Sequence, residues 1–151
     1  MTVARRELDF WTSSYGRREL LTQFVLDGDI EVLREVERAG RLRIVDPPYQ
    51  LAPGIRAVHV GGHTPGQLIV EIDSIGGPLV LASDTIHFYE EMDRDRPFSL
   101  FTDLEEVYRS LETLRAFQAD AVDVIAGHDP LVAEMYPEVA PDCFDLTTSI
   151  S

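Results

Sequence analysis

Three apolar segments of this chain each run into a loop that carries a side chain able to bind a metal ion. The pairs of segment and side chain are 55–60 with His63, 79–82 with Asp84, and 121–126 with His128. Side chains just past strand ends are held by a rigid sheet and still project into open space. Imidazole nitrogens and carboxylate oxygens are ligands that zinc accepts. The sequence therefore predicts a sheet with a metal site along one edge.

The spacing of apolar residues predicts the other elements. Helices are expected at 15–26, 30–39 and 103–118, and strands at 42–45, 55–60, 68–72, 79–82 and 121–126. The last helix has the clearest pattern, because apolar residues recur every three or four positions after Asp103, a suitable N-cap. Segment 83–98 is polar and aromatic, which is typical of a functional loop. We expect one α/β domain over residues 1–151.

The charge balance limits the partners of the chain. Its 151 residues include 27 acidic and 13 basic ones, a formal net charge of −14, so a nucleic-acid backbone or an anionic membrane would be repelled. No apolar stretch approaches the length of a transmembrane helix, and the N-terminus lacks the apolar core of a signal peptide. One cysteine cannot form an internal disulfide. We expect a cytoplasmic protein that binds neither nucleic acid nor membrane.

The loops around the three candidate ligands resemble a known family. Each side chain alone also fits an ordinary turn or cap, but their order and context resemble the last three metal motifs of the metallo-β-lactamase superfamily. The stretches are GGHTPG at 61–66, ASD at 82–84 and AGHDP at 126–130. The chain is most similar to the N-acyl homoserine lactonase branch, in ELDFW at 7–11, LASDTIHFYEEM at 81–92 and GHDPLV at 127–132. The resemblance implies the C-terminal half of the family's αβ/βα sandwich.

The same resemblance implies a metal site and a reaction. His63 would bind one zinc ion, His128 a second, and Asp84 would bridge the two. In that family, metal-bound hydroxide opens a lactone such as an N-acyl homoserine lactone, which is the quorum-quenching reaction. A small lactone or ester is then the expected partner, and zinc the expected cofactor.

The sequence departs from the family in one respect. The upstream H-x-H-x-D-H run, which supplies the remaining ligands in family members, is absent, and the four histidines of the chain are not arranged in that way. His59 lies in a predicted strand and is expected to be a packed or surface residue. With three ligands shared between two ions, we expect weak metal binding and little hydrolase activity. An uncovered sheet face would favour a homo-oligomer or poor solubility.

Two residues soon after Asp84 are candidates for substrate contact and catalysis. Lactonases of this superfamily carry a tyrosine, thought to contact the substrate carbonyl, at the position of His87. The resemblance thus implies a hydrogen bond from His87 to the carbonyl oxygen, with Tyr89 as the next candidate. A solvated loop position for His87 fits the sequence equally well. Nearby apolar residues either line an acyl pocket or cover their own core; they are Phe88, Met92, Phe98 and Phe101.

Three functional interpretations stay open. The leading one is a metal-dependent lactonase. The second is a hydrolase of the same superfamily that cleaves a thioester or a β-lactam in place of a lactone. A third is a non-catalytic fragment that is stable only within an oligomer. A metal assay separates the first from the third, because full family members hold about two zinc ions per chain.

Overall fold

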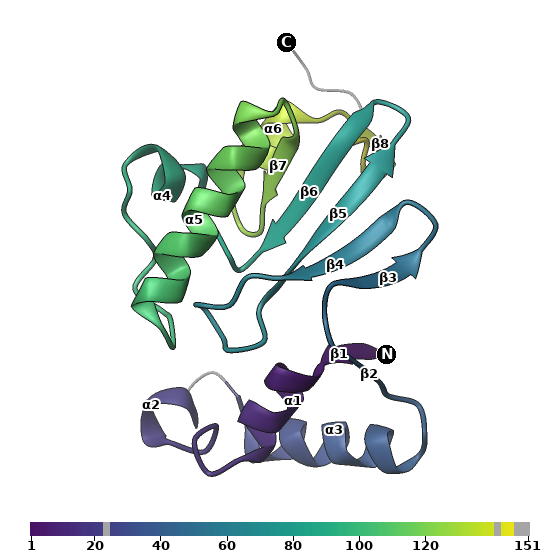
Figure 1. Cartoon of the computed structure of the whole chain (residues 1–151), viewed down its shortest axis with the longest axis vertical. Helices are drawn as coiled ribbons and strands as arrows, with labels where there is room; N and C mark the ends of the chain where they lie inside the picture. Colours follow the sequence, from purple (N-terminus) through teal and green to yellow (C-terminus); the bar gives the residue numbers. More distant parts are fainter. Residues whose placement is uncertain (23–24, 141–142, 147–151) are drawn as a thin grey trace.

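Alternating apolar residues build a five-stranded sheet at the centre of the molecule (Figure 1). The computed structural model describes residues 1–22, 25–140 and 143–146. The strands, in their order across the sheet, are β3 (Tyr49–Ala52), β4 (Ile55–His59), β5 (Leu68–Ser74), β6 (Gly77–Ser83) and β7 (Asp123–Ala126). Neighbouring strands are antiparallel except β6 and β7, which are parallel. The strands predicted from the sequence are present, with their ends shifted by a few residues.

The parallel pair of β6 and β7 decides where two of the candidate ligands meet. Two parallel strands need a crossover connection, and α5 (Leu104–Ala119) lies within it. The register pairs Leu81 with Ile125 and Ser83 with Ala126, so the carboxyl ends of both strands reach the same edge of the sheet. The two loops that follow therefore start side by side.

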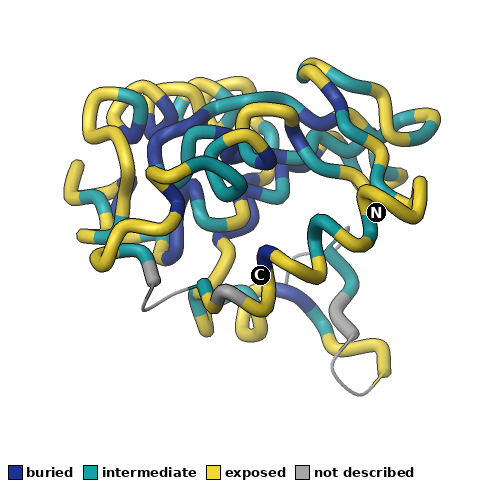
Figure 2. Tube along the Cα trace, turned by 90° about the horizontal axis from the view of Figure 1, so that it is seen from below, coloured by how far each residue is buried: buried dark blue, intermediate teal, exposed yellow. Residues whose placement is uncertain are grey.

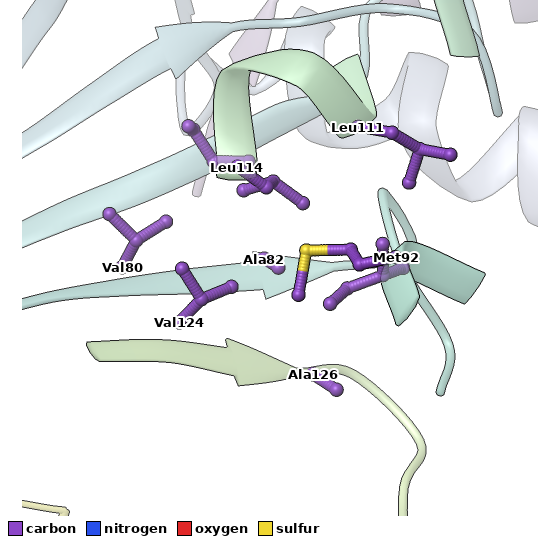
Figure 3. Close-up of a cluster of buried hydrophobic side chains, with 9 residues drawn as sticks. Val80, Ala82, Met92, Leu111, Leu114, Val124 and Ala126 are labelled. Carbon is purple, nitrogen blue, oxygen red and sulfur yellow. The ribbon is translucent and has the colours of Figure 1, made fainter. Parts of the chain in front are cut away.

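Helix α5 covers one face of the sheet and encloses the main core. Asp103 is its N-cap and accepts the N–H of Glu106 at 2.9 Å, which confirms the predicted cap. Figure 3 shows the core cluster, which contains Ile69, Val80, Ala82, Ile86, Met92, Leu111, Leu114, Val124 and Ala126. Truncating a fully buried leucine typically costs about 2–5 kcal/mol. This core therefore holds β6 and β7 rigid behind the loops that they carry.

The opposite face of the sheet is covered in part. A smaller cluster on this face consists of Leu79, Ile125 and Tyr136, with Ile72, Leu81, Val132 and Leu146 packed against it. Leu68 and Val70 share this face by the two-residue period of a strand, and both are half-buried. The cover comes from α6 (Leu131–Met135) and the segment after it.

The N-terminal residues form a helical unit next to one end of the sheet, at the bottom of Figure 1. Its elements are β1 (Thr2–Ala4), α1 (Arg5–Thr12), α2 (Glu19–Thr22), α3 (Asp27–Arg38) and β2 (Arg43–Val45). Strands β1 and β2 pair in parallel. Figure 2 shows that much of this unit is exposed. Leu8 and Ile30 are among its buried residues. The unit therefore adds few residues to the hydrophobic core, and its main contribution is surface near the site.

The structure corrects three predictions of local structure. The helix expected over 15–26 is reduced to α2 within the described residues, while residues 23–24 lie outside them. The helix expected from residue 30 begins at Asp27, because the Asp29 carboxylate accepts the N–H of Leu26 at 3.0 Å and caps it earlier. Segment 83–98 contains a helix, α4 (Tyr89–Asp93), because Glu91 accepts the N–H of Phe88 at 2.9 Å.

The last described elements are two short antiparallel strands, β8 (Glu138–Ala140) and β9 (Cys143–Phe144). Across the described ranges, no helix is long and apolar enough to cross a membrane.

Candidate metal centre

Backbone hydrogen bonds join the loops that follow β6 and β7. The N–H of Gly127 donates to the carbonyl of Ile86 and the N–H of His128 donates to the carbonyl of His87, each at 3.0 Å. Gly127 allows this close approach, because a Cβ there would lie 2.5 Å from the carbonyl oxygen of Ser83. The pairing extends past the strand ends and fixes His128 beside the loop after β6.

The carboxylate of Asp84 lies between two of the predicted ligands. Its Oδ1 is 2.7 Å from Nε2 of His128, and its Oδ2 is 3.9 Å from Nε2 of His63. Two atoms bound to one zinc ion at about 2.0–2.1 Å lie roughly 3.3 Å apart, so the distance to His128 is shorter, and the distance to His63 longer, than a shared ion would give. Each oxygen of Asp84 faces a different histidine, and this arrangement fits a carboxylate that bridges two ions.

A backbone carbonyl orients the ring of His63. Its Nδ1 lies 2.9 Å from the carbonyl oxygen of Leu100. Because a carbonyl oxygen only accepts hydrogen bonds, Nδ1 carries the proton of the neutral ring and Nε2 keeps a lone pair. That lone pair is on the nitrogen nearest Asp84, and metal-bound histidines in proteins are oriented in the same way.

The turn before His63 is packed against the start of α5. The carbonyl of Gly62 accepts the N–H groups of Thr102 and Asp103 at 2.8 and 3.1 Å, and its own N–H donates to the carboxylate of Glu106 at 3.2 Å. Gly62 has a φ of +92°, and a Cβ there would lie 2.7 Å from the backbone nitrogen of Val107. A side chain does not fit this position, so α5 determines where the His63 loop lies.

Glu7 joins α1 to the His63 loop, a role that the sequence analysis missed. Its carboxylate accepts hydrogen bonds from Oγ1 of Thr64 at 2.6 Å, the N–H of Gly66 at 2.9 Å and Nε1 of Trp11 at 2.6 Å. The available signal was the spacing of Glu7 and Trp11, which places both on one face of a helix. Glu7 therefore links the N-terminal unit to a candidate ligand.

His87 lies beside the predicted ligands, and its ring is 9% exposed. The ring stacks on His128 with centroids 5.2 Å apart, meets His63 edge-on at 5.3 Å and packs on Phe98 at 4.3 Å. One donor atom each from Asp84, His87 and His128 lies within 4.8 Å of the others. The alternative of a solvated loop residue is therefore wrong for His87.

Within the described part of the chain, one nitrogen of His87 has no hydrogen-bond partner. Nδ1 is buried and lies 3.6 Å from Oε1 of Glu91, which is beyond hydrogen-bond length. An unpaired buried polar atom typically costs about 1–3 kcal/mol. The ring is therefore held in place by its aromatic neighbours and by the hydrogen bond from the His87 backbone N–H to Glu91.

Glu91 is a buried carboxylate at the centre of the loop, and the sequence analysis did not single it out. It accepts the N–H groups of His87 at 2.6 Å, Phe88 at 2.9 Å and Phe98 at 2.7 Å. Burial raises the pKa of this carboxyl, but the His87 side chain and the three N–H groups outweigh burial, so the pKa lies below its ordinary value. Glu91 therefore holds negative charge next to His87 and closes the loop between residues 87 and 98.

Tyr89 is placed against β7. Its hydroxyl accepts the N–H of Ala126 at 3.4 Å, and its own N–H donates to the carboxylate of Asp129 at 2.9 Å. Burial raises the pKa of the Tyr89 hydroxyl, and Asp129 and Asp123 add to the rise, while the N–H of Ala126 opposes it. The side chain packs against the main core.

A cleft of about 300 Å³ opens beside His63 and Asp84. One wall comes from the N-terminal unit, through Glu7 and Trp11, and another from the segment 100–102. Because both candidate ligands line this cleft, a small molecule bound in it would lie next to them.

The acyl pocket that the sequence allowed is not formed by the expected four residues together. Phe101 lines the cleft beside His63, but Met92 is 4% exposed and belongs to the main core. Phe88 and Phe98 line a separate hollow with Glu91. The helix α4 turns Met92 inward, and this explains the difference.

His59 has a structural position. Its Nε2 lies 2.8 Å from the carbonyl oxygen of Pro65 and 3.1 Å from a guanidinium nitrogen of Arg6. These contacts agree with the packed role expected for this histidine.

Comparisons with known proteins agree with this architecture. No protein-family model matches the chain. A Bacillus N-acyl homoserine lactonase is 31% identical over 90 residues, which are 58% of this chain and 35% of that protein. A solved N-acyl homoserine lactone hydrolase with N-hexanoyl-L-homoserine at its metal centre superposes with a TM-score of 0.67 at 20% identity, covering 99% of this chain and 52% of that chain. The chain has the metallo-β-lactamase fold.

A second solved structure supports the same conclusion. The dizinc quorum-quenching lactonase AidC superposes with a TM-score of 0.68 at 24% identity, covering 85% of this chain and 47% of that chain. The predicted α/β class and the resemblance to the C-terminal part of the superfamily fold are confirmed. The chain spans about half the length of these solved proteins and about a third of the Bacillus enzyme.

Proposed function

We propose that this chain belongs to a metal-dependent hydrolase that opens lactones, with N-acyl homoserine lactones as the leading substrates. The position of the Asp84 carboxylate, between His63 and His128, carries the proposal. The similarity to a Bacillus lactonase and to solved lactonases supports it. The cleft beside His63 and Asp84 gives a small lactone a place to bind.

We propose zinc as the metal, held by His63, Asp84 and His128. Asp84 would bridge two ions, one shared with His63 and the other with His128. Bound zinc would supply a Lewis acid that polarises the ester carbonyl. The chain's own contribution is to fix the two histidines on either side of one carboxylate, through the Leu100 carbonyl and the bonds between the two loops.

Two further residues remain candidates for catalysis. The position of His87 allows either a hydrogen bond to the substrate carbonyl, as the family resemblance implies, or a bond to a metal ion. Substrate contact by Tyr89 remains a prediction, and it would require the hydroxyl to leave the N–H of Ala126. Tyr89→Phe tests the role of Tyr89. A loss of lactone hydrolysis at unchanged zinc content would support contact between the Tyr89 hydroxyl and the substrate.

A second candidate function is a non-catalytic module that works within an oligomer. The half-buried sheet face at Leu68 and Val70 favours it.

The decisive experiment measures zinc content and hydrolysis of N-hexanoyl homoserine lactone on the same samples. We expect Asp84→Ala to lose both, because its carboxylate faces both histidines. Asp120→Ala, an exposed substitution at the end of α5, is the control and should change neither. An Asp84→Ala variant that hydrolyses the lactone as fast as the parent would sink the proposal.

A further inference from the structure

Asp84, His87 and His128 bring three donor atoms to one point. One donor atom of each lies within 4.8 Å of the other two. Asp84 and His87 belong to the loop after β6, and His128 belongs to the loop after β7. The N–H of His128 donates to the carbonyl of His87 at 3.0 Å, so the two loops hold the donors in fixed positions. Every member of the group lies between residues 84 and 128.

Glu91 determines which nitrogen of His87 is free. Nδ1 is buried, has no hydrogen-bond partner among the residues that the structure describes, and lies 3.6 Å from Oε1 of Glu91. A carboxylate only accepts hydrogen bonds, so the proton of a neutral His87 ring belongs on Nδ1. Nε2 then carries a lone pair. A histidine whose one nitrogen faces a carboxylate while the other offers a lone pair has the arrangement of metal-bound histidines.

We propose that Asp84, His87 and His128 together bind one divalent transition-metal ion, with Glu91 orienting the His87 ring. Two imidazoles and one carboxylate form a donor set that zinc accepts, with a fourth position left open. This site shares Asp84 and His128 with the proposed function and adds His87 as a ligand. It rests on the metal-binding part of that function and does not depend on hydrolysis.

The first test measures zinc affinity of the metal-free chain by titration calorimetry. The parent should bind zinc, and His87→Ala and His87→Gln should each bind it at least about tenfold more weakly, since loss of even an outer partner typically costs about 10–100-fold. His59→Ala removes a histidine outside the donor group and should keep the parent affinity. Circular dichroism of each variant checks that the fold is retained.

The second test addresses Glu91. Glu91→Gln should weaken zinc binding by about 10–100-fold, because the neutral amide removes the negative charge beside Nδ1 and accepts fewer of the three N–H bonds that position His87. Glu90→Gln, at the exposed neighbouring position, should leave the affinity unchanged. With cobalt(II) in place of zinc, the visible absorption of the parent should differ from that of His87→Ala, because one imidazole ligand is lost.

The outcomes separate this site from the proposed function. If His87→Ala binds zinc as tightly as the parent while Asp84→Ala and His128→Ala lose it, the ligand role of His87 is overturned. The remaining role for His87 is then contact with the substrate. If the parent binds no zinc, the site is overturned. If zinc affinity depends on His87 but the chain opens no lactone, the site is supported and the proposed function fails.

Discussion

Tyr136 illustrates how burial sets the behaviour of one side chain. Its ring is 2% exposed and packs with Leu79 and Ile125 on the partly covered face of the sheet. Burial, with additions from Asp123 and Tyr89, raises the pKa of the Tyr136 hydroxyl to about 12. In an unfolded chain, a tyrosine ionises at about pH 10. The folded state therefore keeps this proton over a range in which the unfolded state loses it.

We expect the chain to lose stability as pH rises from about 10 towards 12, because proton release favours the unfolded state in that window. Below about pH 10 both states hold the proton and the stabilisation is complete. One pKa unit corresponds to about 1.4 kcal/mol, so the loss should be about 1 kcal/mol by about pH 11. Urea unfolding at about pH 8 and about pH 11 measures it. The free energy of unfolding of Tyr136→Phe should fall less than that of the parent between the two pH values. An equal fall would contradict the role of Tyr136.

Gly62 is the residue at which the His63 loop depends most on the backbone. A Cβ there would lie 2.7 Å from the nitrogen of Val107, and φ is +92°. We expect Gly62→Ala to lower the free energy of unfolding by about 2 kcal/mol or more. Zinc affinity should fall as well, because the next residue is His63. Calorimetric unfolding and zinc titration measure the two effects.

Gly28→Ala is the control for this substitution. Gly28 lies in α3, and a Cβ there would meet no described atom within 4 Å. Alanine should stabilise that helix by about 0.5–1 kcal/mol. Equal effects of the two substitutions would mean that the close contact with Val107 is relieved easily.

At the scale of elements, one carboxylate holds α1 on the loop of a candidate ligand. Glu7 accepts hydrogen bonds from Trp11, Thr64 and Gly66. We expect Glu7→Ala to cost about 2 kcal/mol or more, because a hydrogen bond to a charged group contributes about 1.5–3 kcal/mol. The N–H of Gly66 should also exchange with solvent faster, as hydrogen-exchange mass spectrometry would reveal.

Asp9→Ala provides the matched comparison on the same helix. Asp9 is exposed, so its removal should change stability by less than about 0.5 kcal/mol. If Glu7→Ala changed stability as little as Asp9→Ala, other contacts would hold α1 to the sheet. The N-terminal wall of the cleft would then not depend on Glu7.

At the scale of the whole molecule, one sheet face is less well covered than the other. The face under α5 is closed by the main core, whereas Leu68 and Val70 on the other face are half-buried. Burial of apolar surface stabilises by about 25 cal/mol per Å², so a second copy or another sheet would gain by covering this face. The net charge of −14 opposes association between copies, and salt screens that repulsion.

We therefore expect the chain to self-associate, and to do so more strongly at higher salt. Val70→Lys should reduce the association at least several-fold in sedimentation velocity, because it places a charge on the half-buried face. Gln50→Lys adds the same charge at an exposed position of β3 and should have a smaller effect. A parent chain that sediments as a monomer at every concentration would contradict the expectation.

Local patterns in the chain specify the elements with strong periodicity and the residues that end strands. The apolar spacing after Asp103 and the segments before His63, Asp84 and His128 each specified their own local structure, since burial of one face requires a matching period. Helix α4 does not follow from the sequence pattern, because it depends on Glu91 accepting the N–H groups of Phe88 and Phe98. The spacing of apolar residues in the sequence does not indicate such hydrogen bonds.

Packing between distant segments specifies which nitrogen of His63 and of His87 is free and which carboxylates support the site. The Leu100 carbonyl leaves Nε2 of His63 facing Asp84, and Glu91 lies next to Nδ1 of His87. Glu7 reaches Thr64 across 57 positions of sequence. Such contacts depend on how strands and helices pack, which side-chain types alone do not specify. The chemistry available at the sheet edge could thus be read from the sequence, while its geometry required the fold.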